Sequence, residues 1–215
     1  MKYKIFAGTC LVLIGIFAAT GLYYKNQQGK MYDSMARENA STFVREHSQT
    51  LGSDEAKVTI VEFMDPACET CAAFSPMIKD MVKSNPGRIK LVLRYAPFHE
   101  GADYFVKLLE ASRKQGKYWE TLEVMFNTQQ IWAPHHVAKP EKIWPLLAQT
   151  GLDLDRIKSD MNDPAIEALI KQDLADADAL NVRKTPGFFV NGKPLEPFGR
   201  QQLIQLVKSE FESQY

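Results

Sequence analysis

The sequence lacks an excess of charge of either sign, because 26 Lys and Arg residues balance 26 Asp and Glu residues among 215. It also lacks runs of basic residues, internal repeats and low-complexity segments. Proteins that bind nucleic acid commonly carry clustered basic charge, so we expect no nucleic-acid partner. Apolar residues make up 45% of the chain and charged residues 24%, which is the composition of an ordinary globular protein.

Cysteine is scarce. The chain has three cysteines, which are Cys10, Cys68 and Cys71. Three are too few for a multi-disulfide scaffold, and the absence of a second C-x-x-C pair argues against a four-cysteine zinc site. Cys10 lies in an apolar N-terminal segment, where we expect it to be a small apolar residue within a helix.

Signatures of several enzyme classes are also missing. The chain has no phosphate-binding loop, no Gly-rich nucleotide fingerprint and no Ser-His-Asp order, and we predict neither a cofactor nor a metal site. His135 and His136 could bind a metal ion such as copper, but adjacent histidines in a loop are more often solvated. His99 could lie at the rim of an active site, although a plain loop position is the simpler interpretation.

The N-terminus has the pattern of a targeting segment. Residues 5–24 carry no formal charge, and Lys2 and Lys4 precede them. Twenty apolar residues can span a bilayer as a helix, and the positive flank predicts a cytoplasmic N-terminus. We predict that residues 1–25 form an uncleaved membrane anchor; the alternative is a signal peptide that is removed. Both place the rest of the chain outside the cytoplasm, where a C-x-x-C meets oxidising conditions.

Residues 26–52 are predicted to form a linker and a short stalk helix. No proline or glycine occurs between residues 31 and 50, as in a helix, but the apolar positions there are sparse. This helix is either a solvated stalk between membrane and folded domain or a contact that joins copies of the chain into a homo-oligomer. Gly52 breaks the helix, so we place the folded domain at residues 53–215.

The folded domain has an α/β pattern. A β-branched run predicts a first strand, apolar residues at helical spacing predict the helix after it, and Asn191-Gly192 predicts a two-residue hairpin turn. The full predicted order is strand 58–63, helix 71–84, strand 89–95, a helical region over about 98–182, strand 187–190, strand 193–195 and helix 199–214.

Cys68 and Cys71 form a C-x-x-C motif between the first predicted strand and the helix that follows it. That setting is typical of a thioredoxin-like redox motif. A cysteine at a helix N-terminus meets the positive end of the helix dipole, which favours thiolate over thiol. We therefore predict a redox-active disulfide with Cys68 as the nucleophile and Cys71 as the resolving thiol. The alternative is a copper-binding dithiol protein in metal tolerance, because soft thiolates also hold Cu(I).

Two segments carry a resemblance to a known family. Residues 63–71 (FMDPACETC) and residues 184–192 (KTPGFFVNG) are similar to the motifs of the thioredoxin superfamily. More narrowly, the chain from 54 to 215 resembles the DsbA-like thiol-disulfide oxidoreductases of the bacterial envelope, including relatives tied to suppression of copper sensitivity. The resemblance implies an α/β thioredoxin fold in which the helical region 98–182 is an inserted domain.

The resemblance also implies roles for individual residues. Glu62 matches a buried acid beneath the cysteines, which can exchange a proton with the resolving thiol; the simpler alternative is an outward-facing strand residue. Thr185 and Pro186 match the cis-proline signature, expected to lie against Cys68 with the Thr185 backbone free to pair with a substrate peptide. An ordinary trans turn is the alternative.

The dipeptide Glu69-Thr70 between the cysteines is predicted to contact substrate as well. The carboxylate of Glu69 opposes a thiolate at Cys68 through like-charge repulsion, so we expect a less oxidising couple than in the strongest oxidants. The resemblance implies two kinds of partner, substrate proteins with cysteines and a membrane redox partner, in the bacterial periplasm or cell envelope. The direction of exchange (oxidase, isomerase or reductase) stays open.

Overall fold

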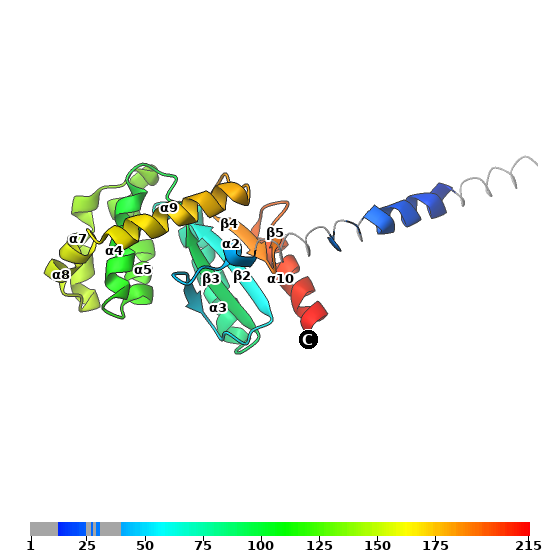
Figure 1. The fold of residues 1–215 in the computed structure, drawn as a ribbon, viewed down its shortest axis with the longest axis horizontal. Coiled ribbons are helices and arrows are strands. Elements are labelled where there is room, and N and C mark those ends of the chain that lie inside the picture. Colours follow the sequence, from blue (N-terminus) through cyan, green and yellow to red (C-terminus); the bar gives the residue numbers. More distant parts are fainter. Residues whose placement is uncertain (1–12, 25–26, 28, 31–39) are drawn as a thin grey trace, which may run out of the picture. The chain divides into compact units, whose positions relative to one another are not determined.

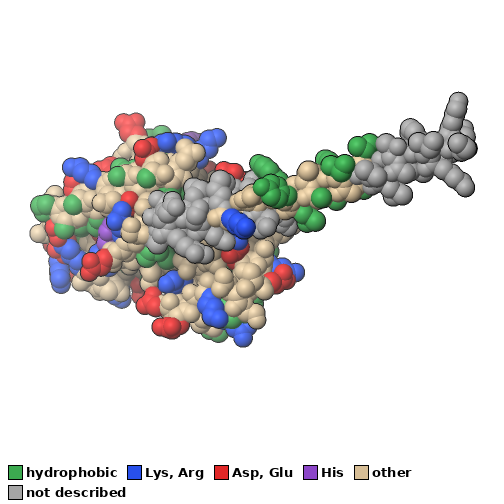
Figure 2. Space-filling view, turned by 45° about the vertical axis from the view of Figure 1, so that its right-hand side comes forward, with side chains coloured by type: hydrophobic (Ala, Val, Ile, Leu, Met, Phe, Trp, Pro, Cys, Tyr) green, Lys and Arg blue, Asp and Glu red, His purple; other side chains and the backbone are tan. Residues whose placement is uncertain are grey.

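The computed structural model describes residues 13–24, 27, 29–30 and 40–215. It contains two compact units, residues 1–40 and 41–215. In the first unit residues 13–24 are helical, and their large apolar side chains are exposed (Figure 2). Part of the predicted span 5–24 lies outside the described residues. Over the part of the chain that is described, no helix combines the length and apolar character needed to cross a membrane.

The second unit contains a five-stranded sheet and a set of helices. Its strands are β1 (Gln49–Leu51), β2 (Val58–Met64), β3 (Ile89–Tyr95), β4 (Gly187–Val190) and β5 (Lys193–Pro194). Its helices are α2 (Ala40–Phe43), α3 (Glu69–Ser84), α4 (Ala102–Arg113), α5 (Tyr118–Asn127), α6 (Gln129–Trp132), α7 (Trp144–Leu147), α8 (Leu154–Asp160), α9 (Pro164–Ala179) and α10 (Arg200–Gln214), with 3₁₀ turns at Pro134–His136, Pro140–Lys142 and Ala148–Thr150.

The sheet has the order β1-β3-β2-β4-β5 (Figure 1). Strands β2 and β3 run parallel, and the other neighbouring pairs are antiparallel. Side chains alternate between the two faces of a strand. Along the buried central strand β2, Val58 and Ile60 pack in the cluster that contains α3 and α10, whereas Val61 and Phe63 pack with residues of α9. Glu62 therefore faces the α3 side.

The predicted helical insertion is confirmed: α4 to α9 cover residues 102–179 between β3 and β4. Its core is aromatic and aliphatic, and the rings of Phe105 and Trp132 lie 4.0 Å apart between centroids. Figure 1 shows α9 leading from this helical region back to the sheet. The predicted hairpin is confirmed too, because Asn191 and Gly192 have φ of 49° and 80°, as a tight primed turn requires.

The helix predicted over residues 31–50 is wrong beyond Phe43, and residues 31–39 lie outside the described part. The chain leaves the helical conformation at residue 44, and Gln49–Leu51 forms the edge strand β1. Gln49 pairs antiparallel with Leu93 of β3. Residues 44–52, predicted as the end of the stalk and its linker, thus belong to the compact unit formed by residues 41–215.

An ion pair of Arg45 and a hydrogen bond of His47 hold this segment on the domain. Arg45 lies 2.7 Å from Asp176 and His47 lies 2.6 Å from Asp173, both on α9. The guanidinium of Arg94, which is fully buried in β3, bonds both carboxylates. Buried charges must be paired to be tolerated, so the N-terminal segment completes a cluster that the sheet and α9 begin.

Candidate active site

The two cysteines lie where β2 turns into α3. Cys68 is the residue that caps the N-terminus of α3, and its N–H donates to the carbonyl of Asp65 at 3.1 Å. The side chain of Asp65 accepts from the N–H of Ala67 at 2.8 Å, which closes the turn. Cys68 is 3% exposed and Cys71 is fully buried, and both are free thiols.

The surroundings of Cys68 favour its thiolate. A hydrogen bond from the thiol of Cys71 is the largest of the causes that lower the pKa of Cys68 to about 5. Burial opposes this, while the Thr185 hydroxyl and the N–H groups of Cys71 and Thr70 add to it. For Cys71, burial and its bond to Cys68 raise the pKa well above the usual range. The two thiols therefore differ strongly, because the thiol of Cys68 ionises readily and the thiol of Cys71 does not.

Glu62 is buried in the core on the same side of the sheet as α3. Burial, aided by the charge at Cys68, raises the pKa of its carboxyl to about 8. Its Oε1 has no hydrogen-bond partner, and its charge raises the pKa of Cys71. An unpartnered carboxyl with a pKa near neutrality can take up and release a proton. Cys71 is the thiol whose pKa is raised by the charge of Glu62.

The loop before β4 lies against Cys68. The peptide bond between Thr185 and Pro186 is cis, and a second cis bond, Glu196-Pro197, was not expected. The Cys68 thiol donates to the carbonyl of Thr185 at 3.3 Å. This contact with the carbonyl favours the neutral thiol of Cys68. The Thr185 hydroxyl, the Cys71 thiol and the backbone N–H groups all favour the thiolate, and together they outweigh the carbonyl.

The residues between the cysteines point away from the core. Glu69 is half-buried and Thr70 is exposed. The carboxylate of Glu69 accepts a hydrogen bond from Gln130 of α6 at 3.1 Å. The groups that lower the pKa of Cys68 are hydrogen-bond donors, and burial is what opposes them. The charge of Glu69, which the sequence predicted to oppose the thiolate, is not among these causes.

Three side chains contact this turn: His99, which the sequence suggested as a residue at the rim of an active site, His136, which it suggested as a metal ligand, and Gln129, which it did not indicate. Gln129 donates to the backbone of the turn, His99 bonds Asp65 at 2.7 Å, and His136 contacts the carbonyl of Ala67 at 3.2 Å. Gln129 could have been noticed as a polar residue on the buried face of its helix, between Met125 and Trp132 at helical spacing. Among the residues that the structure describes, no three potential metal ligands converge.

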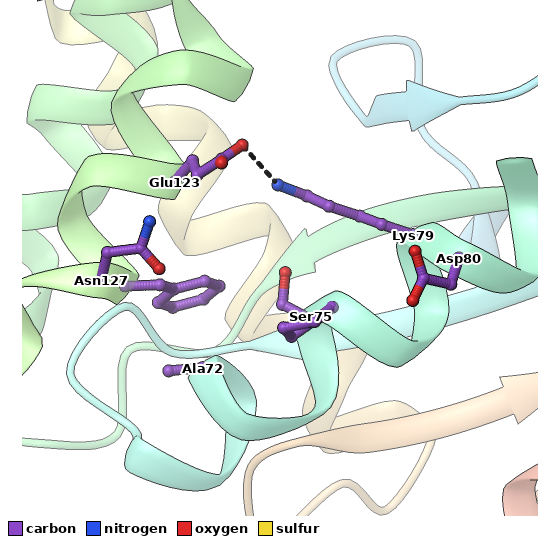
Figure 3. A pocket seen from close by; sticks show the side chains of 8 residues that line it. Ala72, Ser75, Lys79, Asp80, Glu123 and Asn127 are labelled. Carbon is purple, nitrogen blue, oxygen red and sulfur yellow. Dashed lines mark hydrogen bonds and ion pairs between the residues drawn. The ribbon is translucent and has the colours of Figure 1, made fainter.

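A hollow of about 250 Å³ lies between α3 and α5, beside the helix that carries the cysteines (Figure 3). Ala72 and Ser75 line it from α3, and Asn127 lines it from α5. An ion pair between Lys79 and Glu123, 3.5 Å long, crosses it. The hollow begins next to Cys71 but does not include either thiol or the Thr185-Pro186 loop, so it is separate from the reacting atoms.

A dithiol at a helix N-terminus, a buried acid in the strand before it and a cis-proline loop opposite define an α/β protein of the thiol-disulfide exchange class. A family model described as thioredoxin matches residues 44–209. The chain therefore belongs to the thioredoxin family.

Curated proteins and solved structures are similar to all or part of this chain. The chain is 31% identical over 144 residues to a Na(+)/H(+) antiporter NhaA of Herminiimonas arsenicoxydans, covering 67% of this chain and 22% of that protein. The chain thus spans about a fifth of that relative's length. It is 23% identical to a probable disulfide bond formation protein D of Bacillus cereus, over 90% of this chain and 88% of that one. A thioredoxin-like oxidoreductase from Silicibacter pomeroyi is similar in structure, with a TM-score of 0.69, 25% identity and coverage of 81% and 98%.

Proposed function

We propose that this chain is a DsbA-type thiol-disulfide oxidoreductase that exchanges disulfides with cysteine-containing proteins outside the cytoplasm. The observation that carries the proposal is the asymmetry of the pair, in which the pKa of Cys68 is lowered to about 5 and that of Cys71 is raised. Such a pair reacts through one sulfur and resolves through the other.

In the oxidising direction, a substrate thiolate attacks the sulfur of Cys68 in the Cys68–Cys71 disulfide. The S–S bond breaks, and Cys71 leaves with the electron pair and takes a proton. A second substrate thiolate then attacks the substrate sulfur of the mixed disulfide and expels Cys68 as a thiolate. The substrate loses two electrons and becomes a disulfide, while the enzyme pair gains them. A membrane redox partner would then reoxidise the pair.

The low pKa of Cys68 supports this direction. A thiol of low pKa is a good leaving group, and a stabilised thiolate favours the reduced enzyme. Glu62 is the proposed proton carrier for Cys71, because its carboxyl has a pKa of about 8 and lacks a hydrogen-bond partner at Oε1. Its role is to give Cys71 the proton that this sulfur needs on leaving and to remove it when the pair is reoxidised.

Substrate contacts are proposed around the exposed edge of the pair. The Thr185 backbone beside the cis-Pro186 would pair with an extended peptide, and Glu69 and Thr70 would meet the residues that flank the substrate cysteine.

Trapping of mixed disulfides tests the proposal. Cys71→Ala leaves Cys68 without its resolving partner, so covalent complexes with substrate proteins should accumulate in cells and disappear on reduction. Cys68→Ala is the matched control, because it keeps one cysteine of the pair but removes the acidic one. If Cys71→Ala traps nothing, or if Cys68→Ala traps as much, Cys68 is not the nucleophile and the proposal fails.

A further inference from the structure

Three consecutive carbonyl groups of the active-site turn accept hydrogen bonds from side chains of the helical insertion. The amide nitrogen of Gln129 donates to the carbonyl of Pro66 at 2.7 Å and to that of Cys68 at 3.1 Å. Nδ1 of His136 lies 3.2 Å from the carbonyl of Ala67. A carbonyl oxygen only accepts, so this contact requires the proton of His136 on Nδ1.

The Gln129 side chain is restrained by the packed core of the helical insertion. Its residue is 3% exposed and lies one turn before the fully buried Trp132. The indole N–H of Trp132 donates to the carbonyl of Met125 at 2.8 Å, and its ring packs on Phe105. A side chain in such a packed setting has little rotational freedom, so both N–H bonds of one amide are fixed on the turn.

The opposite edges of two of these three peptide groups are fixed too. The N–H that shares a peptide plane with the Pro66 carbonyl donates to the Asp65 carboxylate, and the N–H paired with the Ala67 carbonyl donates to the Asp65 carbonyl. The other carboxylate oxygen of Asp65 accepts from His99, whose ring stacks on that of His136 with centroids 4.5 Å apart. A planar peptide group held at both edges cannot rotate.

We propose that Gln129 is a positioning residue for the exchange reaction, assisted by His136. By fixing the turn from the carbonyl side, it keeps the first N–H groups of α3 directed at the sulfur of Cys68. The inference rests on the proposed function, because it assigns to the helical insertion a part in making the nucleophile reactive. The N–H groups of Thr70 and Cys71, which favour the thiolate, belong to the first turn of α3, directly after the residues that Gln129 and His136 hold.

Gln129→Met tests the proposal, since methionine matches the length of glutamine but has no N–H group. The pH dependence of alkylation of Cys68 by iodoacetamide is measured on the reduced full chain, with Cys68 followed by peptide mass spectrometry. We expect the midpoint to rise by about one pH unit, which is a tenfold change in the acid dissociation constant of Cys68. Gln115→Met is the matched control: Gln115 also makes two bonds to backbone, both to Asp153 within the insertion, and its loss should leave the midpoint unchanged.

A second variant keeps the test decisive if Gln129→Met fails to fold. His136→Phe retains a ring to stack on His99 but has no donor for the Ala67 carbonyl, and it should raise the midpoint by less. A folded Gln129→Met protein with the wild-type midpoint overturns the proposal, as does an equal rise in Gln115→Met. Neither result bears on the oxidoreductase function itself, which is tested separately by the trapping of mixed disulfides with Cys71→Ala and Cys68→Ala.

Discussion

Replacement of the buried carboxyl of Glu62 by an amide should make the protein more stable and slower in exchange. Glu62→Gln keeps the size of the side chain and removes its charge. Burial and the charge at Cys68 raise the pKa of Glu62 from 4.5 to about 8 in the folded protein, so the unfolded chain ionises this group first. Stability is therefore unaffected below pH 4.5 and is lost as the pH rises from 4.5 towards 8.

The size of the effect follows from the two pKa values. At pH 7 the carboxyl is ionised in the unfolded chain and mostly neutral in the folded protein. The free energy of unfolding is therefore lowered progressively over the interval between pH 4.5 and pH 7. At about 1.4 kcal/mol for each pH unit, this is about 3 kcal/mol. For a chain of this size it corresponds to a rise in Tm of roughly 6–12 °C in the variant.

Urea unfolding of the reduced wild-type and Glu62→Gln proteins at pH 4 and pH 7 measures this difference. Because the charges of Glu62 and Cys68 act on each other, the difference between the two proteins measures Glu62 together with its coupling to Cys68. Glu210→Gln is the matched control, since Glu210 is also buried but lies 2.7 Å from Lys193; it should lose stability at pH 7. Equal stability of wild type and Glu62→Gln at pH 7, or the same gain at pH 4 as at pH 7, would refute the reasoning.

Three further outcomes are expected. Alkylation of Cys68 in the wild-type chain should have its midpoint near pH 5, against about 8.5 for a free cysteine; a midpoint above 8 would contradict the assigned hydrogen bonds. Thr185→Val removes one hydroxyl donor and should raise that midpoint, while Cys71 and the backbone N–H groups keep it below 8.5. Glu69→Gln keeps an acceptor for Gln130 and should change the redox potential, measured against glutathione, by less than about 30 mV, equivalent to about one pKa unit; a larger change would mean that the charge of Glu69 acts on Cys68.

Local patterns in the sequence were sufficient for the central elements of the fold. The β-branched run of β2 and the apolar spacing of α3 are signals contained within each segment, and Asn191-Gly192 specifies its turn through the φ values it tolerates. The position of Cys68 at the start of a helix also followed from a short motif, whereas the position of Pro186 against Cys68 followed from the resemblance to the thioredoxin superfamily.

Features that depend on pairing between distant segments could not be read in this way. The segment that contains β1 pairs with β3 and contacts Asp176 and Asp173 through Arg45 and His47, more than 120 residues apart in the chain. No pattern within the segment predicts those contacts. For the same reason the helical periodicity marks Gln129 as an anomaly on a buried face without indicating what it binds. Its partners are backbone carbonyls of another segment, and backbone groups leave no trace in the sequence.

The oxidising direction proposed above agrees with how Cys68 and Glu62 act on stability together. The pKa of Cys68 falls from 9.0 to about 5 on folding, so its thiolate stabilises the reduced protein above that range and loses this contribution as the pH drops through 5. At pH 7 this contribution opposes the cost of Glu62. In the disulfide form Cys68 no longer titrates, and the burial cost of Glu62 remains without this compensation. A protein whose reduced form is the more stable one passes its disulfide to substrates, and this is the physical reason to expect an oxidant.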